Sequence, residues 1–516
     1  MYVKRRLSFL IIICCYPFFS MSQPNTFFKM YVDSQETGIQ SNALVATMDT
    51  GFVMTGELYM KNAMIMKISK EGDVKWSKII GSKNNGFPHF NAYSLVRTYD
   101  SCFLITGSYQ LNSTTVLSAL CMKMDAKGNP LWSKIINYSG YDTKSYCVDQ
   151  TRDSGFIFTG TSSIGPNNSK IFILKLDRDG NLKWSNLLGS AGSNVAGYKI
   201  RETTDSAYVI MGTMESKNSC LLKVSSKGTF LWGKRYTLGA RSFFGNDVLV
   251  LNNGFLCYSG KDIVTLLKTD FTGNPIWCKS YNQISSGYPD IAPSSIAAYG
   301  NNFILVNGNC LSAGAMIKVD STGEVIWSKS LNLIPVDVKQ TYGNNLLILG
   351  NGPLCFVSPG TKTWQMGIIQ TDSMGDAGQC VSVRNEVAVN AIPSVTSLAF
   401  QSTFGAILDS ITYSLDSVDI LTYIQCVNNK GGISDNSRKN EVMIIPNPSR
   451  GVFSIMMNEN MGGKIEIYDL MKNRIYNAIY DAQQLEVDLS SYPSGMYFYN
   501  IISGNKNFTG KLIVVK

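Results

Sequence analysis

Short apolar runs, separated by polar turns, recur along most of this chain. In one unit the runs fall at residues 92–98, 103–108, 119–125 and 130–136. They are rich in Ile, Val, Tyr and Phe and too short for helices, which is typical of β-strands. The joints within each half of the unit carry Asp, Asn and Gly, residues that suit tight hairpin turns with positive φ. The pattern therefore predicts an antiparallel unit of four strands.

The tryptophans show that this unit repeats. Six of the seven tryptophans follow an Asp-x-x-Gly turn or a variant of it, such as 125–128, and five of the six have a lysine two positions later, three of them as Ser-Lys. Successive tryptophans are 45 to 56 residues apart. Four-stranded units that repeat at such a spacing are typical of propeller blades, which close radially and protect their strand edges. The six tryptophans are Trp76, Trp132, Trp184, Trp232, Trp277 and Trp327.

The first and last units indicate how the ring closes. A seventh unit has strand-like runs at 336–342, 346–350 and 367–371, but no fourth run follows. Near the start of the chain, residues 26–31 form an orphan run with an aromatic residue before a lysine, like the Trp-Ser-Lys strands. We expect this run to supply the missing strand. The sequence predicts an all-β chain with a seven-bladed propeller over residues 23–379, closed by its N-terminal strand.

The first 22 residues resemble a secretory signal peptide. Lys4, Arg5 and Arg6 precede an apolar stretch at 7–19, and small residues follow at 20–22. The stretch is shorter than the ~20 residues needed to span a membrane. Without these three positive charges the net charge falls from +9 to +6. Lys and Arg are scattered, so we expect no nucleic-acid partner. No later stretch has 18 apolar residues, so we expect no membrane span in the mature protein. We also expect a monomer.

Residues 380–437 break the repeat. They hold two strand-like stretches, at 386–400 and 407–426, before a polar linker at 428–440. Two interpretations are open: a small β module, or an addition to the propeller rim. Cys380 and Cys426 lie here, outside the repeats, and an oxidising export route makes them candidates for a disulfide. The eight cysteines within the repeats are expected to be buried thiols.

Residues 438–516 have the pattern of a small β-sandwich, with period-two alternation at 464–470. Their motifs resemble the type A C-terminal sorting domain of the bacterial type IX secretion system. The resemblance implies handling by that machinery and export to the cell surface or the medium. One position departs from the pattern, because Lys472 stands where a glycine is usual. The residues that carry the resemblance include Pro446, Asn447, Pro448, Gly451, Gly495, Tyr497, Lys511 and Lys516.

The repeats resemble the secreted seven-bladed propellers of Bacteroidetes-type bacteria, a fold that hosts many functions. Long connections between strands should gather on one face of the disc and carry aromatic side chains beside polar ones. Such loops suit the recognition of a glycan or a protein ligand, although aromatics there can also cap the blade ends. The residues expected on this binding face are Phe87, His89, Tyr141, Arg241, Phe243, Phe244 and Tyr288.

The composition limits the possible chemistry. His89 is the one histidine, so a His-rich metal site is excluded and a Ser-His-Asp triad would have to use it. No metal and no cofactor are expected, and no catalytic residue is assigned. A glycoside hydrolase or polysaccharide lyase with paired carboxylates is the alternative to a binding protein. Its candidates are Asp149, Glu202 and Asp247, and carboxyls roughly 5–10 Å apart in an open cleft would favour it.

Overall fold

The computed structural model describes the chain from residue 26 to residue 514, with gaps. Within this part, no helix is long and apolar enough to cross a membrane. The signal peptide lies outside the described residues. The gaps are at 34–37, 59–61, 81–88, 111–115, 139, 166–167, 191, 216, 240–242, 261–263, 282–294, 310–312, 342–343, 353–364, 379–380, 385–387, 400, 404–406, 411–414, 418–419, 428–441, 446–448, 450, 458–462, 470–472, 481–483 and 504–505.

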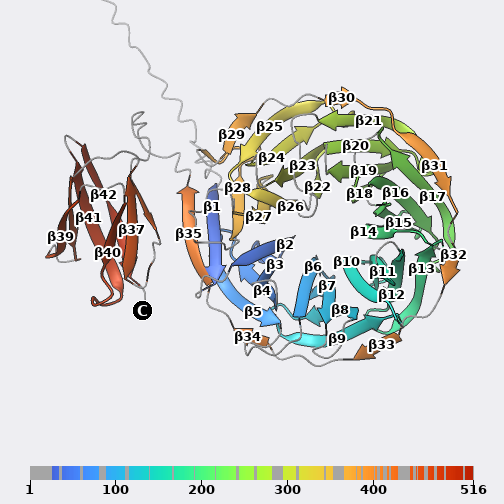
Figure 1. Ribbon diagram of the computed structural model, residues 1–516, viewed down its shortest axis with the longest axis horizontal. Helices are drawn as coiled ribbons and strands as arrows, with labels where there is room; N and C mark the ends of the chain where they lie inside the picture. The colour runs from blue at the N-terminus through green and yellow to red at the C-terminus, as the bar shows by residue number, and fades with distance from the viewer. Residues whose placement is uncertain are drawn as a thin grey trace, which may run out of the picture.

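Seven antiparallel sheets surround a central axis, with their first strands innermost (Figure 1). The seven-bladed propeller predicted from the repeat is confirmed. Blades 1 to 4 consist of β2 (Ile39–Ala46), β3 (Phe52–Leu58), β4 (Asn62–Ile68) and β5 (Val74–Ile80); β6 (His89–Arg97), β7 (Phe103–Gln110), β8 (Leu117–Met124) and β9 (Pro130–Asn137); β10 (Asp142–Gln150), β11 (Phe156–Ser163), β12 (Ser169–Leu176) and β13 (Leu182–Gly189); and β14 (Val195–Glu202), β15 (Tyr208–Met214), β16 (Asn218–Val224) and β17 (Phe230–Thr237).

Blade 7 is the one that the two ends of the repeat build together. Its fourth strand is β1, at the start of the described chain, and Phe27 of β1 pairs with Gln370 of β28. The N-terminal strand therefore closes the ring, as the orphan run at 26–31 predicted. Blades 5 to 7 consist of β18 (Gly245–Leu251), β19 (Gly254–Gly260), β20 (Val264–Thr269) and β21 (Pro275–Tyr281); β22 (Ser295–Tyr299), β23 (Asn302–Asn309), β24 (Ala313–Val319) and β25 (Val325–Leu331); and β26 (Ile334–Gln340), β27 (Leu346–Asn351), β28 (Met366–Thr371) and β1 (Phe27–Asp33).

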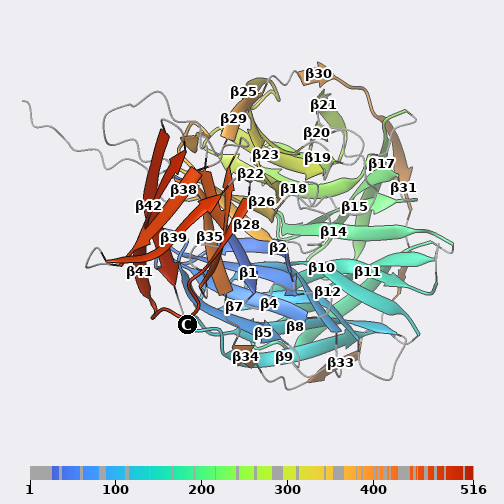
Figure 2. The same ribbon diagram turned by 60° about the vertical axis from the view of Figure 1, so that its left-hand side comes forward.

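Residues 381–427 run once around the outside of the ring and add a fifth strand to every blade. We call this segment the belt. It passes the blades in the order 6, 5, 4, 3, 2, 1 and 7, opposite to the order of the repeats, and lies at the outer edge of the ring in Figure 1. Several of its strands are again seen at the edge in the turned view of Figure 2. Its strands are β29 (Val381–Arg384), β30 (Ala388–Asn390), β31 (Ser394–Leu398), β32 (Gln401–Thr403), β33 (Ile407–Ser410), β34 (Leu415–Ser417) and β35 (Ile420–Val427).

The belt matches the second of the two interpretations left open for residues 380–437, an addition to the rim. Each belt strand pairs antiparallel with the fourth strand of its blade; Lys329 of β25, for example, pairs with Val383 of β29. An outermost strand otherwise exposes unpaired N–H and C=O groups that can recruit other chains. The belt therefore covers part of the outer edge of each blade. The domain boundaries at 379/380 and 437/438 stay predictions.

The two hairpin turns of a blade use different residues. The turn between the third and fourth strands has a glycine with φ near +80°, as the Asp-x-x-Gly motif predicted; Gly323, with φ +82°, is one example. The turn between the first two strands differs from the expectation of Asp, Asn or Gly. In four blades its positive-φ residue is Ser or Thr, such as Ser154 with φ +64°. The neighbouring Asp153 binds Lys175 of the third strand at 2.9 Å, which fixes this turn.

Each blade is fastened to the next through its fourth strand. The tryptophan of that strand lies against the turn glycine of the following blade, so closely that a Cβ on Gly323 would be 2.9 Å from the Trp277 ring. Phe27 takes the same place against Gly72 at the point where the ring closes. We call this contact the aromatic–glycine latch. The other pairs are Trp76–Gly128, Trp132–Gly180, Trp184–Gly228, Trp232–Gly273 and Trp327–Gly375.

Polar groups reinforce the latch. In three blades a buried tyrosine of the fourth strand donates a hydrogen bond to the carbonyl of the same glycine; the Tyr281 hydroxyl, for instance, lies 2.8 Å from Gly323 O. At four of the joints a lysine two positions after the aromatic residue binds the residue after the glycine, as Lys329 Nζ binds Asp376 Oδ1 at 2.6 Å. The repeated Trp-Ser-Lys motif therefore encodes the joint between blades rather than a ligand site.

The last seven strands form a separate small sandwich with its own apolar core. One sheet has the order β36-β37-β40 and the other β39-β38-β41-β42. Its buried cluster includes Phe453, Ile465 and Leu512, and every member lies between residues 453 and 514. The strands are β36 (Val442–Ile445), β37 (Val452–Met457), β38 (Gly463–Tyr468), β39 (Arg474–Tyr480), β40 (Gln484–Asp488), β41 (Gly495–Ser503) and β42 (Lys506–Val514).

The latch predicts unequal costs for two glycine substitutions. Gly323→Ala forces both a positive φ and a clash with Trp277, whereas Gly300, with φ +60°, has nothing within 4 Å of an added Cβ. Gly300→Ala should therefore cost only backbone strain. We expect Gly323→Ala to lower the free energy of unfolding by about 1–3 kcal/mol more than Gly300→Ala does. Urea denaturation of both variants measures the difference, and equal costs would show that the latch does not bear on stability.

Ring closure predicts a large effect of removing residues 23–33. Phe27, Phe28, Met30 and Tyr31 are all at most 5% exposed, so the deletion exposes apolar surface and frees the edge of β28. The thermal midpoint should fall by on the order of 10 °C. Removing residues 438–516 is the matched control, because the sandwich has its own core, and it should leave the midpoint of the ring unchanged. An equal midpoint for the two truncations would contradict closure by β1.

Candidate functional site

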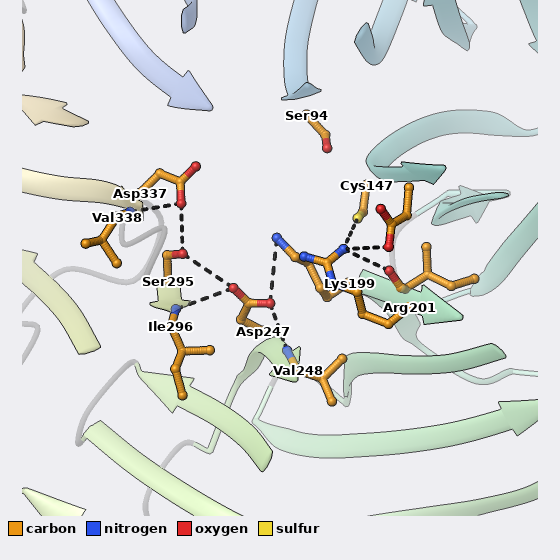
Figure 3. A network of polar contacts seen from close by, with 12 residues as sticks. Ser94, Cys147, Lys199, Arg201, Asp247, Val248, Ser295, Ile296, Asp337 and Val338 are labelled. Carbon is orange, nitrogen blue, oxygen red and sulfur yellow. Dashed lines mark hydrogen bonds and ion pairs between the residues drawn. The ribbon is translucent and has the colours of Figure 1, made fainter. Parts of the chain in front are cut away.

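The innermost strands bring one residue from each blade to the centre of the ring. In six of them the pairing with the second strand slips at a β-bulge, as between Ser145 and Cys147 of β10. Bulges re-aim side chains, and the residue after each bulge occupies an equivalent position. Figure 3 labels all of these residues except Ala43, and their side chains lie around a common space. From blade 1 to blade 7 these residues are Ala43, Ser94, Cys147, Lys199, Asp247, Ser295 and Asp337.

Two carboxylates from blades 5 and 7 meet at a serine of blade 6. The Ser295 hydroxyl lies 2.9 Å from Asp337 Oδ1 and 3.4 Å from Asp247 Oδ2 (Figure 3). Each carboxylate also has its own cation. Lys199 Nζ is 3.6 Å from Asp247 Oδ1, and Lys339 Nζ is 2.7 Å from Asp337 Oδ1.

A third ion pair lies on blades 3 and 4. Arg201 Nη1 is 3.4 Å from Asp149 Oδ2, and it also donates to the carbonyl of Ile200 and approaches the Cys147 sulfur at 3.9 Å. We call the six charged residues of these three pairs the central network. Solvent still reaches them in part, because the Arg201 and Asp149 side chains are 29% and 26% exposed.

Burial and charge compete in the central network, and charge prevails. Burial lowers the pKa of Lys199, but the negative charges of Asp247 and Asp337 more than offset this and raise it above its usual value. Burial raises the pKa of Asp337, yet Lys339 and Lys199 lower it overall. The ionised form of each group is therefore favoured. Neither residue is suited to act as a general acid or base near neutral pH.

The central side chains also satisfy backbone groups of the neighbouring blade. Ser94 accepts a hydrogen bond from the amide of Val148 in blade 3. Asp247 Oδ2 accepts from the amide of Ile296 in blade 6, and Asp337 Oδ2 from that of Leu44 in blade 1. An innermost strand has a free edge, and its buried N–H groups need partners. The acidic residues at the centre therefore have a structural role, because they accept hydrogen bonds from these backbone amides.

Three tyrosines occupy the bulges of blades 2, 3 and 4, immediately before the central residues. The rings of Tyr93 and Tyr146 have centroids 5.4 Å apart, and those of Tyr146 and Tyr198 are 5.1 Å apart. All three are partly exposed. We call them the tyrosine arc. Burial, together with the neighbouring phenols, raises the pKa of Tyr146, and burial raises that of Tyr198, so both hydroxyls stay protonated.

A carboxyl group without a described cation lies next to the tyrosine arc. Asn91, turned so that its amide group is satisfied, donates to Glu57 Oε1 and accepts from the Tyr93 hydroxyl, each at 3.2 Å. Burial raises the pKa of Glu57. The Tyr93 hydroxyl is also 3.2 Å from Ser108 Oγ. Glu57 is thus a described carboxyl beside the tyrosine arc whose pKa is raised rather than lowered.

Sequence reasoning did not select the tyrosine arc. The signal was present, because Tyr93, Tyr146 and Tyr198 recur at spacings of 53 and 52 residues, which match the repeat. The bulge that turns these side chains inward leaves no mark in the apolar pattern. The sequence analysis instead predicts the binding residues in the long connections between strands.

Few of those expected loop residues can be placed. Phe87, Arg241 and Tyr288 lie outside the described residues, as does the side chain of His89, which begins β6. Phe243 is only 1% exposed and belongs to an apolar cluster. A side chain so placed offers no surface to a ligand and fits the capping role that the sequence left open.

The other two loop aromatics are partly buried. Tyr141 bridges back to Tyr138 and packs against the apolar cluster between blades 2 and 3. Phe244 follows the buried Phe243 and is itself partly exposed. The binding role of the loop residues stays a prediction, and the structure does not gather these side chains into one described cluster.

The three carboxylates of the enzyme hypothesis do not share one site. Asp149 and Asp247 belong to the central network, but each is paired with its own cation, Arg201 or Lys199. Glu202, at the end of β14, instead accepts a hydrogen bond from the amide of Arg152, at 2.7 Å. No cluster of His, Cys, Asp and Glu that could hold a metal ion is found in the described part of the chain.

Residues expected to carry the sorting signal lie at defined places in the sandwich. Gly451 has φ +123°, and a Cβ there would lie 2.4 Å from Ser490 Cα, so this position requires glycine. Tyr497 is buried and donates to the Pro493 carbonyl at 2.7 Å. Gly495 begins β41, and Lys511 lies exposed on β42. Pro446, Asn447, Pro448 and Lys516 are outside the described residues.

The predicted disulfide stays a prediction, because Cys380 and the side chain of Cys426 are outside the described part. Among the other cysteines, Cys121, Cys147, Cys220, Cys257 and Cys278 are free and buried, as expected for thiols within strands, and Cys102 is free but partly exposed.

The central network predicts a pH dependence that Asp337 carries. Its pKa is lowered in the folded protein, so its contribution to stability is present above the unfolded value of about 3.9 and is lost as pH falls toward the lower folded value. At pH 6, Asp337→Asn should lower the free energy of unfolding by roughly 1.5–3 kcal/mol. Urea denaturation from pH 6 to pH 3 should show this difference shrinking. A constant difference would contradict the assignment.

Comparison with known proteins identifies the C-terminal part. Residues 443–515 match the family described as the secretion system C-terminal sorting domain. Comparison with curated proteins gives no match. A solved protein of unknown function from Bacteroides caccae is 13% identical; the alignment covers 54% of this chain and 93% of that one, with a TM-score of 0.37.

Two further solved structures are similar at low identity. The extracellular domain of a putative one-component system from B. thetaiotaomicron is 10% identical, with 94% of this chain and 59% of that chain covered and a TM-score of 0.40. An intramolecular trans-sialidase from Ruminococcus gnavus is 9% identical, with 67% and 97% covered and a TM-score of 0.33.

The strand order gives the fold and the family match gives the destination. This chain is a seven-bladed β-propeller protein whose C-terminal type IX secretion sorting domain directs it to the cell surface or the medium.

Proposed function

We propose that this chain is an exported binding protein whose ligand, a glycan or a protein, contacts the centre of the ring. The observation that carries the proposal is the contrast between two neighbouring sets of side chains. The carboxylates of the central network are all paired with cations. The hydroxyls of Tyr146 and Tyr198 make no hydrogen bond to the described part of the chain.

The paired carboxylates count against the enzyme alternative. A glycosidase of the usual kind needs one carboxyl that is protonated and one that is free to act as nucleophile or base. Asp337 favours its ionised form and is held by Lys339, while Ser295 donates a hydrogen bond to the same carboxylate oxygen. Releasing either partner would leave a buried charge unpaired, which is costly.

The raised pKa of Glu57 is the one observation that favours a hydrolase, which is therefore the second candidate function. Burial favours its protonated form, and it lies close to the tyrosine arc through Asn91. A general acid requires such a raised pKa. It also requires a second, ionised carboxylate beside the substrate, and every ionised carboxylate of the central network already has a cation.

Binding and hydrolysis can be separated with one set of polysaccharides. Immobilised xylan, β-glucan and mannan, and an extract of surface proteins, should be incubated with the exported chain. We expect retention on at least one ligand with no release of reducing ends above the level of buffer alone. Reducing-end release that Glu57→Gln abolishes would favour the hydrolase and overturn the binding proposal.

A further inference from the structure

We infer that the tyrosine arc recognises an uncharged, hydroxyl-rich ligand, the end of a neutral oligosaccharide. The inference rests on the proposed binding function and specifies the ligand class at the same site. It follows from three properties at the centre of the propeller. Two phenol hydroxyls make no hydrogen bond to the described part of the chain, the tyrosine rings are closely spaced, and the acidic and basic side chains balance.

The first property is free hydrogen-bonding capacity. Tyr146 and Tyr198 are each partly exposed, and their hydroxyls make no hydrogen bond to the described part of the chain. A phenol hydroxyl can donate one hydrogen bond and accept others. Tyr93 differs, because Ser108 and Asn91 hold its hydroxyl. The arc therefore presents two adjacent unpartnered hydroxyls beside one that is fixed.

The second property is the close packing of the rings. Centroids only 5.1–5.4 Å apart leave no room for a ligand ring between two tyrosines. Insertion would need about 7 Å, twice the ordinary contact distance between carbon atoms. The middle ring, Tyr146, has a tyrosine on each side. Recognition by the arc thus relies on its hydroxyl edge rather than on stacking against the faces of Tyr146.

The third property is electrical neutrality. Three acids and three bases form the pairs Asp149–Arg201, Asp247–Lys199 and Asp337–Lys339. A charged ligand group would have to displace one member of a pair and leave its partner uncompensated. A ligand with hydroxyl groups meets no such cost, because it can donate to and accept from the phenols and the outer atoms of the network.

A neutral saccharide matches these properties better than an acidic one. It carries neighbouring hydroxyls that can act as both donors and acceptors, and it needs no counter-ion from the protein. Because no net charge is involved, its affinity should change little with ionic strength. An acidic saccharide would instead need unpaired cations, and the three of the central network are already engaged.

The test is isothermal titration calorimetry of the full exported chain with six probes. Xylohexaose, cellohexaose, mannohexaose and maltohexaose are neutral, while hexagalacturonate and a heparin hexasaccharide are acidic. We expect at least one neutral probe to bind, with an affinity that is unchanged between 50 mM and 500 mM NaCl, and neither acidic probe to bind as tightly. Tighter binding of an acidic probe, or no binding of any neutral probe, would overturn the inference.

Variants of the arc locate the binding. Tyr146→Phe and Tyr198→Phe each remove one hydroxyl and should weaken the bound neutral probe by roughly 2- to 12-fold, the equivalent of one hydrogen bond. Tyr99→Phe is the matched control, because Tyr99 is 66% exposed in the hairpin turn that follows β6, six residues beyond Tyr93, and it should leave the affinity unchanged. Thermal midpoints of all three variants should equal that of the parent.

The outcomes separate this inference from the function on which it rests. A neutral probe whose affinity is the same in both arc variants would overturn the arc as its site and leave the binding function intact. Binding of a protein partner alone would overturn the ligand class. Cleavage of a probe, seen as new reducing ends, would instead overturn the binding function itself.

Discussion

The contact between an outer-strand aromatic ring and the turn glycine of the next blade is the constraint on which the rest of this structure depends. A propeller blade buries its faces only against its neighbours, so every joint must bring two sheets to the same separation. The Trp277 ring fills the space that a side chain at Gly323 would need, and the same pairing recurs around the ring. Because Phe27 meets Gly72 in the same way, the joint that closes the circle is built like the other six.

The belt extends this closure from the strands to the edges. β1 lies between β28 and β35, so the start of the described chain is held on one side by the last blade and on the other by the last belt strand. The belt reverses the direction of the repeats, and each of its short strands covers part of an edge that would otherwise invite association with other chains. For a protein exported to the cell surface or the medium, covered strand edges lower the tendency to associate with other chains during and after export.

The sequence predicted what is local and repeated, and it failed where a feature depends on distant parts of the chain. The Trp-Ser-Lys strands and the turn glycines marked the blades, and the orphan run at 26–31 marked the closure. The belt strands are as short as Gln401–Thr403, too short for periodicity to resolve, and their partners lie far away in sequence. Phe243 looked like a loop aromatic because burial between blades cannot be seen locally. The central network depends on bulges in the innermost strands of six blades, because Lys199, Asp247 and Asp337 each directly follow one.

The chemistry at this axis follows from the fold. Seven innermost strands converge with free edges, so their inward side chains must satisfy backbone amides as well as one another. Asp247 and Asp337 do both, since each accepts an amide of the next blade and binds a lysine. Carboxylates committed in this way stabilise the centre and are poorly placed to exchange protons with a substrate. The hydroxyls of Tyr146 and Tyr198 make no hydrogen bond to the described residues and so have no such structural task there. Ligand recognition can therefore reside in these phenols without disturbing the ion pairs at the axis.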